Sequence, residues 1–167
     1  MKIAVEAAKK LDKVIIVPTI CDYYRPDSRK LFTFDEKVTI ITKMISNAPG
    51  NIVIDSLEKD KDSKWRTINT VEEFKKLYPN DELYLIIGED SYKNFPTWFR
   101  YEDILLMATL MVVQRGNNKE DLVKTIPCEE LHIGKDFLEA SSSKVRNKLI
   151  SELMGMYLGD ADWYNKL

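Results

Sequence analysis

The sequence predicts an α/β fold: a Rossmann-like, doubly wound parallel sheet in a single domain. Short apolar runs rich in Val and Ile recur along the chain, and segments with helical spacing of apolar residues separate them. The runs are continuous rather than alternating, which is typical of strands buried on both faces of a parallel sheet. Alternation of such strands with helices is the pattern of a doubly wound sheet.

Six apolar runs are predicted to be strands. They are Lys2–Val5, Val14–Val17, Ile52–Ile54, Leu83–Ile87, Leu110–Val113 and Leu131–Ile133. The single histidine of the chain, His132, lies in the last of them. Because one histidine cannot build a multi-histidine metal site, we expect His132 to be structural and the protein to hold no metal of its own.

Four helices are predicted around these strands. Thr33 and Glu36 form a capping box, since the Thr hydroxyl can accept a backbone N–H while the Glu side chain reaches back. The apolar face of that helix is Phe34, Val38, Ile41 and Ile45. A second capping box at Thr70–Glu73 predicts a helix that ends at the turn Tyr78–Asp81. The other two helices are expected over Tyr101–Ala108 and from Ser142 to about Met154.

Length and composition indicate an ordinary soluble domain. The 167 residues suit one domain, 1–167, with 150–167 as a C-terminal helical tail. The chain has 25 basic and 27 acidic residues, so we expect neither a nucleic-acid partner nor a membrane. No apolar run approaches the ~20 residues of a membrane span, and the apolar start is too short for a signal peptide. Cys21 and Cys128 form no CxxC pair. We expect a reduced, cytoplasmic protein, and homo-oligomer formation stays open.

The connection between the first two predicted strands is short for a parallel crossover. Only residues 6–13 separate Val5 from Val14. A helical return over a strand of ~16 Å needs about eleven residues plus loops. Three interpretations compete: the sequence omits residues between Val5 and Glu6, the protein carries a deletion there, or Lys2–Val5 is not a parallel neighbour of Val14–Val17. The first two together are favoured.

Two candidate ligand motifs follow the predicted strand Leu83–Ile87. Gly88 lets a ligand approach the backbone, and Asp90 could accept hydrogen bonds from sugar hydroxyls at the sheet edge where such folds bind ligands. A plain strand-to-helix turn capped by Asp90 explains the pair equally well. Trp98, followed by Phe99, could stack on a flat heterocycle, although an isolated Trp more often belongs to the core.

Cationic and hydroxyl side chains indicate phosphate binding. Ser142 and Ser143 open a predicted helix with Arg146 one turn inside, which favours a phosphate site over a simple serine cap. Arg115 ends another strand and could reach an anionic substrate. Lys30, Arg25 and Arg29 lie in the loop after the second strand. Two interpretations of these cations are equally favoured: they bind phosphate, or they are solvated surface charges. The chain has no GxxxxGK[ST] and no GxGxxG, which disfavours NTPases and dehydrogenases.

Taken together, these segments resemble the bacterial-type nicotinate-nucleotide adenylyltransferases of the HxGH-type nucleotidyltransferase superfamily. The likeness covers Met1 to about Ile150 and rests on LDKVIIVPT (11–19), RTINTVEEFKKLYPNDELYLIIGEDSYKNFPTWFRYEDIL (66–105), VVQRG (112–116) and SSSKVR (141–146). The resemblance implies transfer of AMP from ATP, with Mg²⁺, to nicotinate or nicotinamide mononucleotide, releasing pyrophosphate in NAD biosynthesis. Which mononucleotide is preferred stays open.

The resemblance also implies two sets of binding residues. ATP would be bound by Gly88, Asp90, Ser142, Ser143 and Arg146, and the pyridine mononucleotide by Thr67, Trp98, Phe99, Arg115 and Lys30. Trp98 would stack on the pyridine ring, and Thr67 with the backbone near Trp98 and Phe99 would hold its carboxylate or amide. The mononucleotide's own phosphate attacks ATP, so the protein supplies positioning and charge neutralisation rather than a nucleophile.

Some features depart from the family pattern. The family's HxGH-type motif follows its first strand, whereas here Val5 is followed directly by Glu6 and neither histidine is present, so no catalytic residue is assigned. Ala140 and Ser143 alter the serine motif, and Asn69 stands where an acidic residue is usual. Two alternatives therefore stay open: a catalytically inactive nucleotide-binding module, and an adenylyltransferase for another phosphate such as pantetheine phosphate, which Trp98 disfavours.

Overall fold

The computed structural model describes residues 1–19, 32–62, 64–115 and 126–133. The chain packs as two units, and the first, residues 1–114 and 118–133, holds all of the described residues except Arg115. The predicted helix from Ser142, the predicted tail and Cys21 lie outside the described residues. The single-domain organisation stays a prediction.

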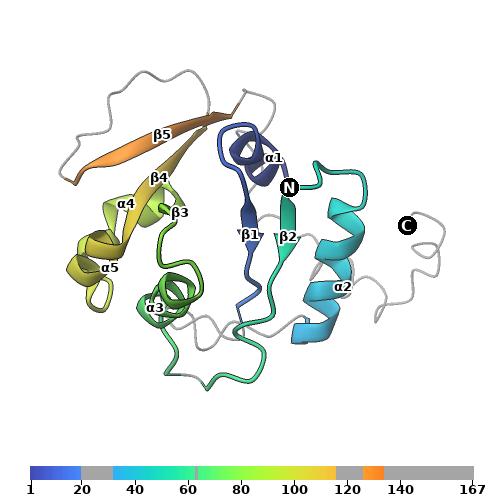
Figure 1. The fold of residues 1–167 in the computed structure, drawn as a ribbon, viewed down its shortest axis with the longest axis horizontal. Coiled ribbons are helices and arrows are strands. Elements are labelled where there is room, and N and C mark those ends of the chain that lie inside the picture. Colours follow the sequence, from blue (N-terminus) through green and yellow to red (C-terminus); the bar gives the residue numbers. More distant parts are fainter. Residues whose placement is uncertain (20–31, 63, 116–125, 134–167) are drawn as a thin grey trace, which may run out of the picture. The chain divides into compact units, whose positions relative to one another are not determined.

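The described strands form two sheets (Figure 1). In the first, β1 (Val14–Ile16) and β2 (Ile52–Ile54) pair in parallel. In the second, the order is β3 (Leu83–Gly88), β4 (Ala108–Arg115) and β5 (Cys128–Ile133), with β3 and β4 parallel. Five of the six predicted strands are therefore confirmed, and so is the predicted parallel pairing for β1 with β2 and for β3 with β4.

Strand β4 shows why its run is uniformly apolar. Leu110, Met111, Val112 and Val113 are at most 2% exposed, so both faces of the strand are covered. Leu110 and Val112 belong to one buried cluster, and Met111 and Val113 belong to a second. Successive side chains point to opposite faces of a strand, so β4 contributes to a core on each side of its sheet.

The first segment of the chain is a helix, and the prediction of a strand there is wrong. Helix α1 (Lys2–Ala8) runs through Val5 and Glu6 without interruption. Lys2–Val5 is thus not a parallel neighbour of β1, as the third interpretation of the short crossover held. Eight residues are too few for a helical crossover, whereas a continuous helix buries Ala7 completely against the core.

Helix α2 (Phe34–Ile45) begins at the predicted capping box. The Glu36 backbone N–H donates to Thr33 Oγ1 at 3.3 Å, and the Thr33 N–H donates to Glu36 Oε2 at 2.7 Å. The backbone N–H and the hydroxyl of Thr33 both donate to the Glu36 carboxylate, and these two hydrogen bonds lower its pKa below the ordinary value. The predicted apolar face is half-buried, whereas Ile40 and Met44, which lie to one side of that face, are exposed.

Helix α3 (Thr67–Leu77) begins earlier than the predicted capping box at Thr70. Asn69 Oδ1 accepts from the Arg66 backbone N–H at 3.0 Å, so these two residues mark the start of the helix. The Thr70 hydroxyl has other partners: it accepts from Trp65 Nε1 at 2.8 Å and donates to Glu58 Oε1 at 2.7 Å. The predicted turn after the helix is confirmed at Tyr78, where α3 is capped.

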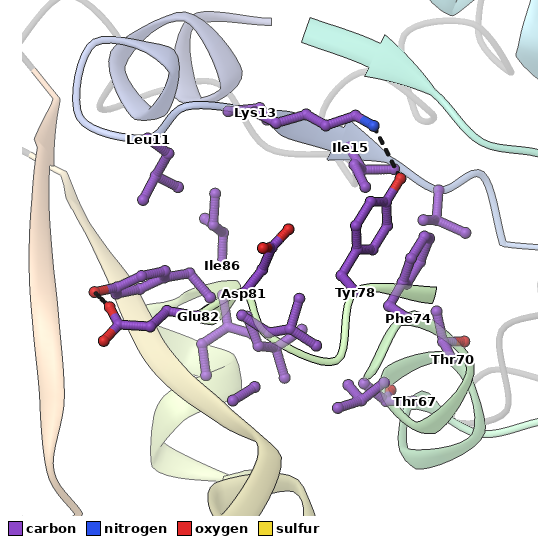
Figure 2. A pocket seen from close by; sticks show the side chains of 18 of the residues that line it. Leu11, Lys13, Ile15, Thr67, Thr70, Phe74, Tyr78, Asp81, Glu82 and Ile86 are labelled. Atoms are coloured by element: carbon purple, nitrogen blue, oxygen red, sulfur yellow. Dashed lines mark hydrogen bonds between the residues drawn. The ribbon is translucent and has the colours of Figure 1, made fainter. Parts of the chain in front are cut away.

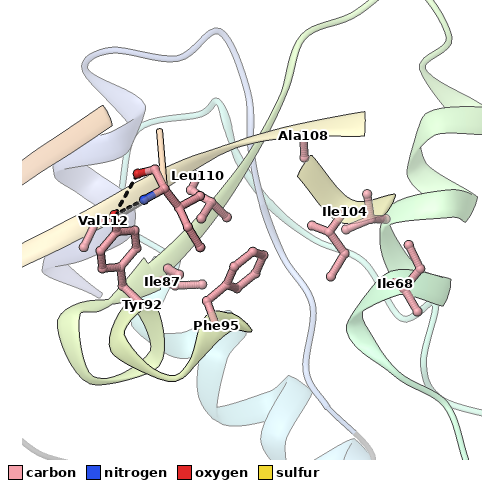
Figure 3. Close-up of a cluster of buried hydrophobic side chains, with 10 residues drawn as sticks. Ile68, Ile87, Tyr92, Phe95, Ile104, Ala108, Leu110 and Val112 are labelled. Atoms are coloured by element: carbon pink, nitrogen blue, oxygen red, sulfur yellow. Dashed lines mark hydrogen bonds between the residues drawn. The ribbon is translucent and has the colours of Figure 1, made fainter. Parts of the chain in front are cut away.

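Three short helices connect β3 to β4. They are α4 (Glu89–Lys93), the 3₁₀ helix η1 (Phe95–Thr97) and α5 (Tyr101–Met107), the last in close agreement with the predicted helix. Their buried side chains pack with α3 and β4 into one cluster (Figure 3), in which Ile68, Phe95 and Ile104 are fully buried. None of the helices in the described part of the chain is long and apolar enough to cross a membrane.

Candidate functional site

A cavity of about 860 Å³ lies between β1 and β3 (Figure 2). One wall carries Ile15 of β1, the other carries Leu85 and Ile86 of β3, and α3 contributes Thr70 and Phe74. Among the described strands, β1 pairs only with β2 and β3 only with β4. The volume lies within the ~300–1,000 Å³ typical of small-molecule sites.

Two of the predicted mononucleotide residues border this cavity. Thr67, half-buried, is the first residue of α3, and Trp98, also half-buried, follows η1. The Trp98 ring packs on Phe95, with centroids 5.2 Å apart and an interplanar angle of 49°. The sequence predicts that Trp98 either belongs to the core or offers a stacking surface. The structure shows both, because the residue packs against the core and also lines the cavity.

The other predicted residues near these strands lie elsewhere. Gly88 ends β3 with open space in front of its Cα, and Asp90 is exposed in the first turn of α4. Phe99 is 62% exposed. None of these three lines the cavity. No side chain caps α4 by a hydrogen bond, so the interpretation of Asp90 as a helix cap is wrong.

The remaining predicted residues give no geometry for the site. Arg115 is the last residue of β4. Lys30, Ser142, Ser143 and Arg146 lie outside the described residues. The structure thus brings together Thr67 and Trp98, and the predicted phosphate-binding residues stay predictions.

Glu58 is a cavity-lining residue that the sequence analysis missed. Its side chain is buried, with 9% exposure for the residue, and its Oε1 accepts the Thr70 hydroxyl at 2.7 Å. Thr70 in turn accepts from the Trp65 indole N–H, so a chain of hydrogen bonds ties the loop before α3 to the first turns of that helix. Glu58 precedes the polar stretch Lys59–Lys64, and no local pattern distinguishes it from solvated charge.

A second pair borders the cavity near the residues where β1 and β3 begin. Lys13 Nζ donates to Tyr78 Oη at 2.9 Å, and the Tyr78 ring stacks on Phe74 with centroids 6.3 Å apart. These side chains lie along one edge of the cavity in Figure 2. Thr67 and Trp98, by contrast, belong to segments that follow β2 and β3 in the chain, and ligands of open α/β sheets bind at that carboxyl edge.

Comparison with known proteins places the chain among nucleotidyltransferases. The family model of cytidylyltransferase-like proteins matches residues 1–148. A "Probable nicotinate-nucleotide adenylyltransferase" of Borreliella burgdorferi is 30% identical over 159 residues, which cover 92% of this chain and 77% of the relative. The chain belongs to the nicotinate-nucleotide adenylyltransferase family. A relative of the same name from Citrifermentans bemidjiense is 30% identical over 130 residues, covering 76% of this chain and 59% of the relative.

A solved structure supports the fold of this nicotinate-nucleotide adenylyltransferase family member. It is the Plasmodium falciparum nicotinic acid mononucleotide adenylyltransferase complexed with NaAD, with a TM-score of 0.68 and 21% identity. The match covers 87% of this chain and 75% of that chain. The predicted Rossmann-like nucleotidyltransferase fold is thereby confirmed. The chain spans 59% to 77% of the lengths of the two curated relatives described above.

Proposed function

We propose that the protein transfers the AMP group of ATP to nicotinate mononucleotide, or to nicotinamide mononucleotide, and releases pyrophosphate. The product is the dinucleotide of NAD biosynthesis, and the reaction takes place in the cytoplasm. Family membership supports this proposal, and the observation that carries it is the placement of Thr67 and Trp98 on one cavity. These two residues come from separate segments, so their convergence is a property of the fold.

The pyridine ring is proposed to bind between Trp98 and the start of α3. The indole face offers a stacking surface for a flat heterocycle. Thr67 is the first helical residue, where backbone N–H groups and the positive end of the helix dipole favour a carboxylate. A ring carboxylate gains from both effects, whereas a neutral amide gains only the hydrogen bonds.

Gly88 and Asp90 are proposed to bind ATP, which enters with Mg²⁺. Ser142, Ser143 and Arg146, proposed for the ATP phosphates, and Lys30, proposed with Arg115 for the mononucleotide, lie outside the described residues, except Arg115. Arg146 would supply a bidentate cation, and the two serines would supply hydroxyl donors. The phosphate of the mononucleotide is the nucleophile, so this binding and neutralisation are the protein's contribution to the reaction.

A nucleotide-binding module without turnover is the second candidate. The observation behind it is that helix α1 runs through Val5 and Glu6 without interruption, so the family's histidine motif does not lie between these two residues. The one histidine of the chain, His132, is on β5 with 63% of its side chain exposed. Binding of ATP and the mononucleotide would then persist while adenylyl transfer is lost.

Pyrophosphate release separates the two candidates. We expect release from Mg·ATP with either pyridine mononucleotide and none with pantetheine phosphate, measured on protein whose intact mass is 19.4 kDa. Binding of both ligands by calorimetry without pyrophosphate release would support the inactive module.

A further inference from the structure

Arg100 has an unusual backbone conformation close to the proposed mononucleotide site. Its φ of 54° and ψ of 42° place it in the left-handed region, and no other non-glycine residue in the described part of the chain has a positive φ. A side chain with a Cβ rarely adopts this conformation, and it persists where neighbouring contacts impose it. Such residues often lie at functional sites, so the contacts of Arg100 deserve an explanation.

Two carboxylates from different helices hold the Arg100 guanidinium. Nη1 lies 3.0 Å from Glu72 Oε1 on α3, and Nε donates to Asp103 Oδ2 on α5 at 2.5 Å. The Arg100 carbonyl accepts the backbone N–H groups of Asp103 and Ile104, so the residue also begins α5. Hydrogen bonding to Asp103 raises the pKa of Arg100 further, so the side chain is charged at every physiological pH.

The segment just before Arg100 carries Trp98. The Trp98 N–H donates to the Phe95 carbonyl at 2.9 Å, and the Trp98 carbonyl accepts from Tyr101 at 3.2 Å. Phe95 is fully buried, so the backbone from Phe95 to Tyr101 is fixed at both ends. Arg100 therefore lies two residues from Trp98 within a hydrogen-bonded segment.

Helix α3 carries the other side of the proposed pyridine site. Thr67 and Glu72 are on this helix, and Ile68 next to Thr67 is fully buried with Ile104 of α5 (Figure 3). Apolar packing brings α3 and α5 together but does not by itself fix the relative orientation of the two helices. The ion pair of Arg100 with Glu72 adds a directional link between the two helices.

We propose that Arg100 is a positioning residue, whose link to Glu72 sets the spacing between Thr67 and Trp98 and thereby the affinity for the pyridine mononucleotide. The proposal rests on the proposed function. Arg100 is not a ligand of the substrate, because its guanidinium is already engaged by two carboxylates. A residue that only stabilised α5 would need Asp103 but not Glu72.

Steady-state kinetics with both mononucleotides and ATP test this role. Arg100→Asn removes both ion pairs while asparagine tolerates the left-handed backbone, and Glu72→Gln removes the inter-helix pair alone. We expect each variant to raise the KM for either mononucleotide by about five-fold, with kcat and the KM for ATP unchanged. The double variant should show no more than the larger single effect, because both changes break one link.

Glu73→Gln is the matched control. Glu73 is on the same helix and its Oε1 is 2.7 Å from Lys76 Nζ, so the variant loses an ion pair that does not reach α5. Its kinetic constants should equal those of the parent protein. Unchanged KM values in Arg100→Asn and Glu72→Gln, or equal increases for ATP and mononucleotide, would overturn the positioning role.

Comparison of the two mononucleotides tests whether Arg100 contacts the ring carboxylate directly. If the guanidinium bound the ring carboxylate, its removal would raise the KM for nicotinate mononucleotide alone. That result would also overturn the proposal. The Glu72→Gln variant covers the case in which Arg100→Asn does not fold. Parent protein that neither turns over nor binds either mononucleotide would refute the proposed function itself, and this assignment with it.

Discussion

Trp98 is the residue on which the proposed recognition of the pyridine ring depends. It packs on the buried ring of Phe95 and lines the cavity, so it is held in place on one side and available to a ligand on another. The sequence could indicate a stacking role for Trp98, because an aromatic residue shortly after the glycine turn is a local pattern. It could not predict the partial burial of Trp98 or the burial of Glu58, because both depend on contacts with residues distant in the sequence.

Replacing Trp98 by alanine should weaken binding of the mononucleotide more than binding of ATP. The stacking surface is lost, and we expect the KM for the mononucleotide to rise about ten-fold with a smaller change for ATP. Trp98→Phe keeps an aromatic face, so its KM for the mononucleotide should lie between those of the parent protein and Trp98→Ala. Equal effects on both substrates, measured by pyrophosphate release, would indicate that Trp98 supports the fold rather than the ring.

Local and non-local helix signals differ in how well they predict elements. The Thr33–Glu36 capping box lies within four residues, and both of its reciprocal hydrogen bonds form. The Thr70 signal is of the same kind, but its hydroxyl is taken by Trp65 and Glu58 from outside the helix. Helix α1 could not be predicted from the apolar run Lys2–Val5, because burial of Ala7 and the short connection decide it.

The capping box predicts a pH dependence for α2. The folded-state pKa of Glu36 is lowered, so its contribution to stability is present above the ordinary value of 4.5 and is lost as pH falls through the folded value. The parent protein should therefore exceed Glu36→Gln in Tm near neutral pH, and the difference should shrink in acid below that value. A Tm difference that does not change with pH would show that the hydrogen bonds to Glu36 carry no stability through its charge.

At the scale of the molecule, the runs of Val and Ile predicted strands but not which strands pair. The described strands form a β1–β2 sheet and a β3–β4–β5 sheet, where the sequence predicted one. Lys2–Val5 was expected beside β1 and instead forms α1, so no described strand lies between β1 and β3. Pairing depends on connection length and on packing from distant segments, and a local pattern contains neither. The cavity at that place could not be predicted either.

Hydrogen exchange with and without nicotinate mononucleotide tests most directly whether this cavity binds the substrate. The account predicts slower amide exchange at the start of α3 around Thr67 and in the segment from Phe95 to Tyr101, with no change in α2. Protection confined to other segments, or no protection at saturating mononucleotide, would contradict it.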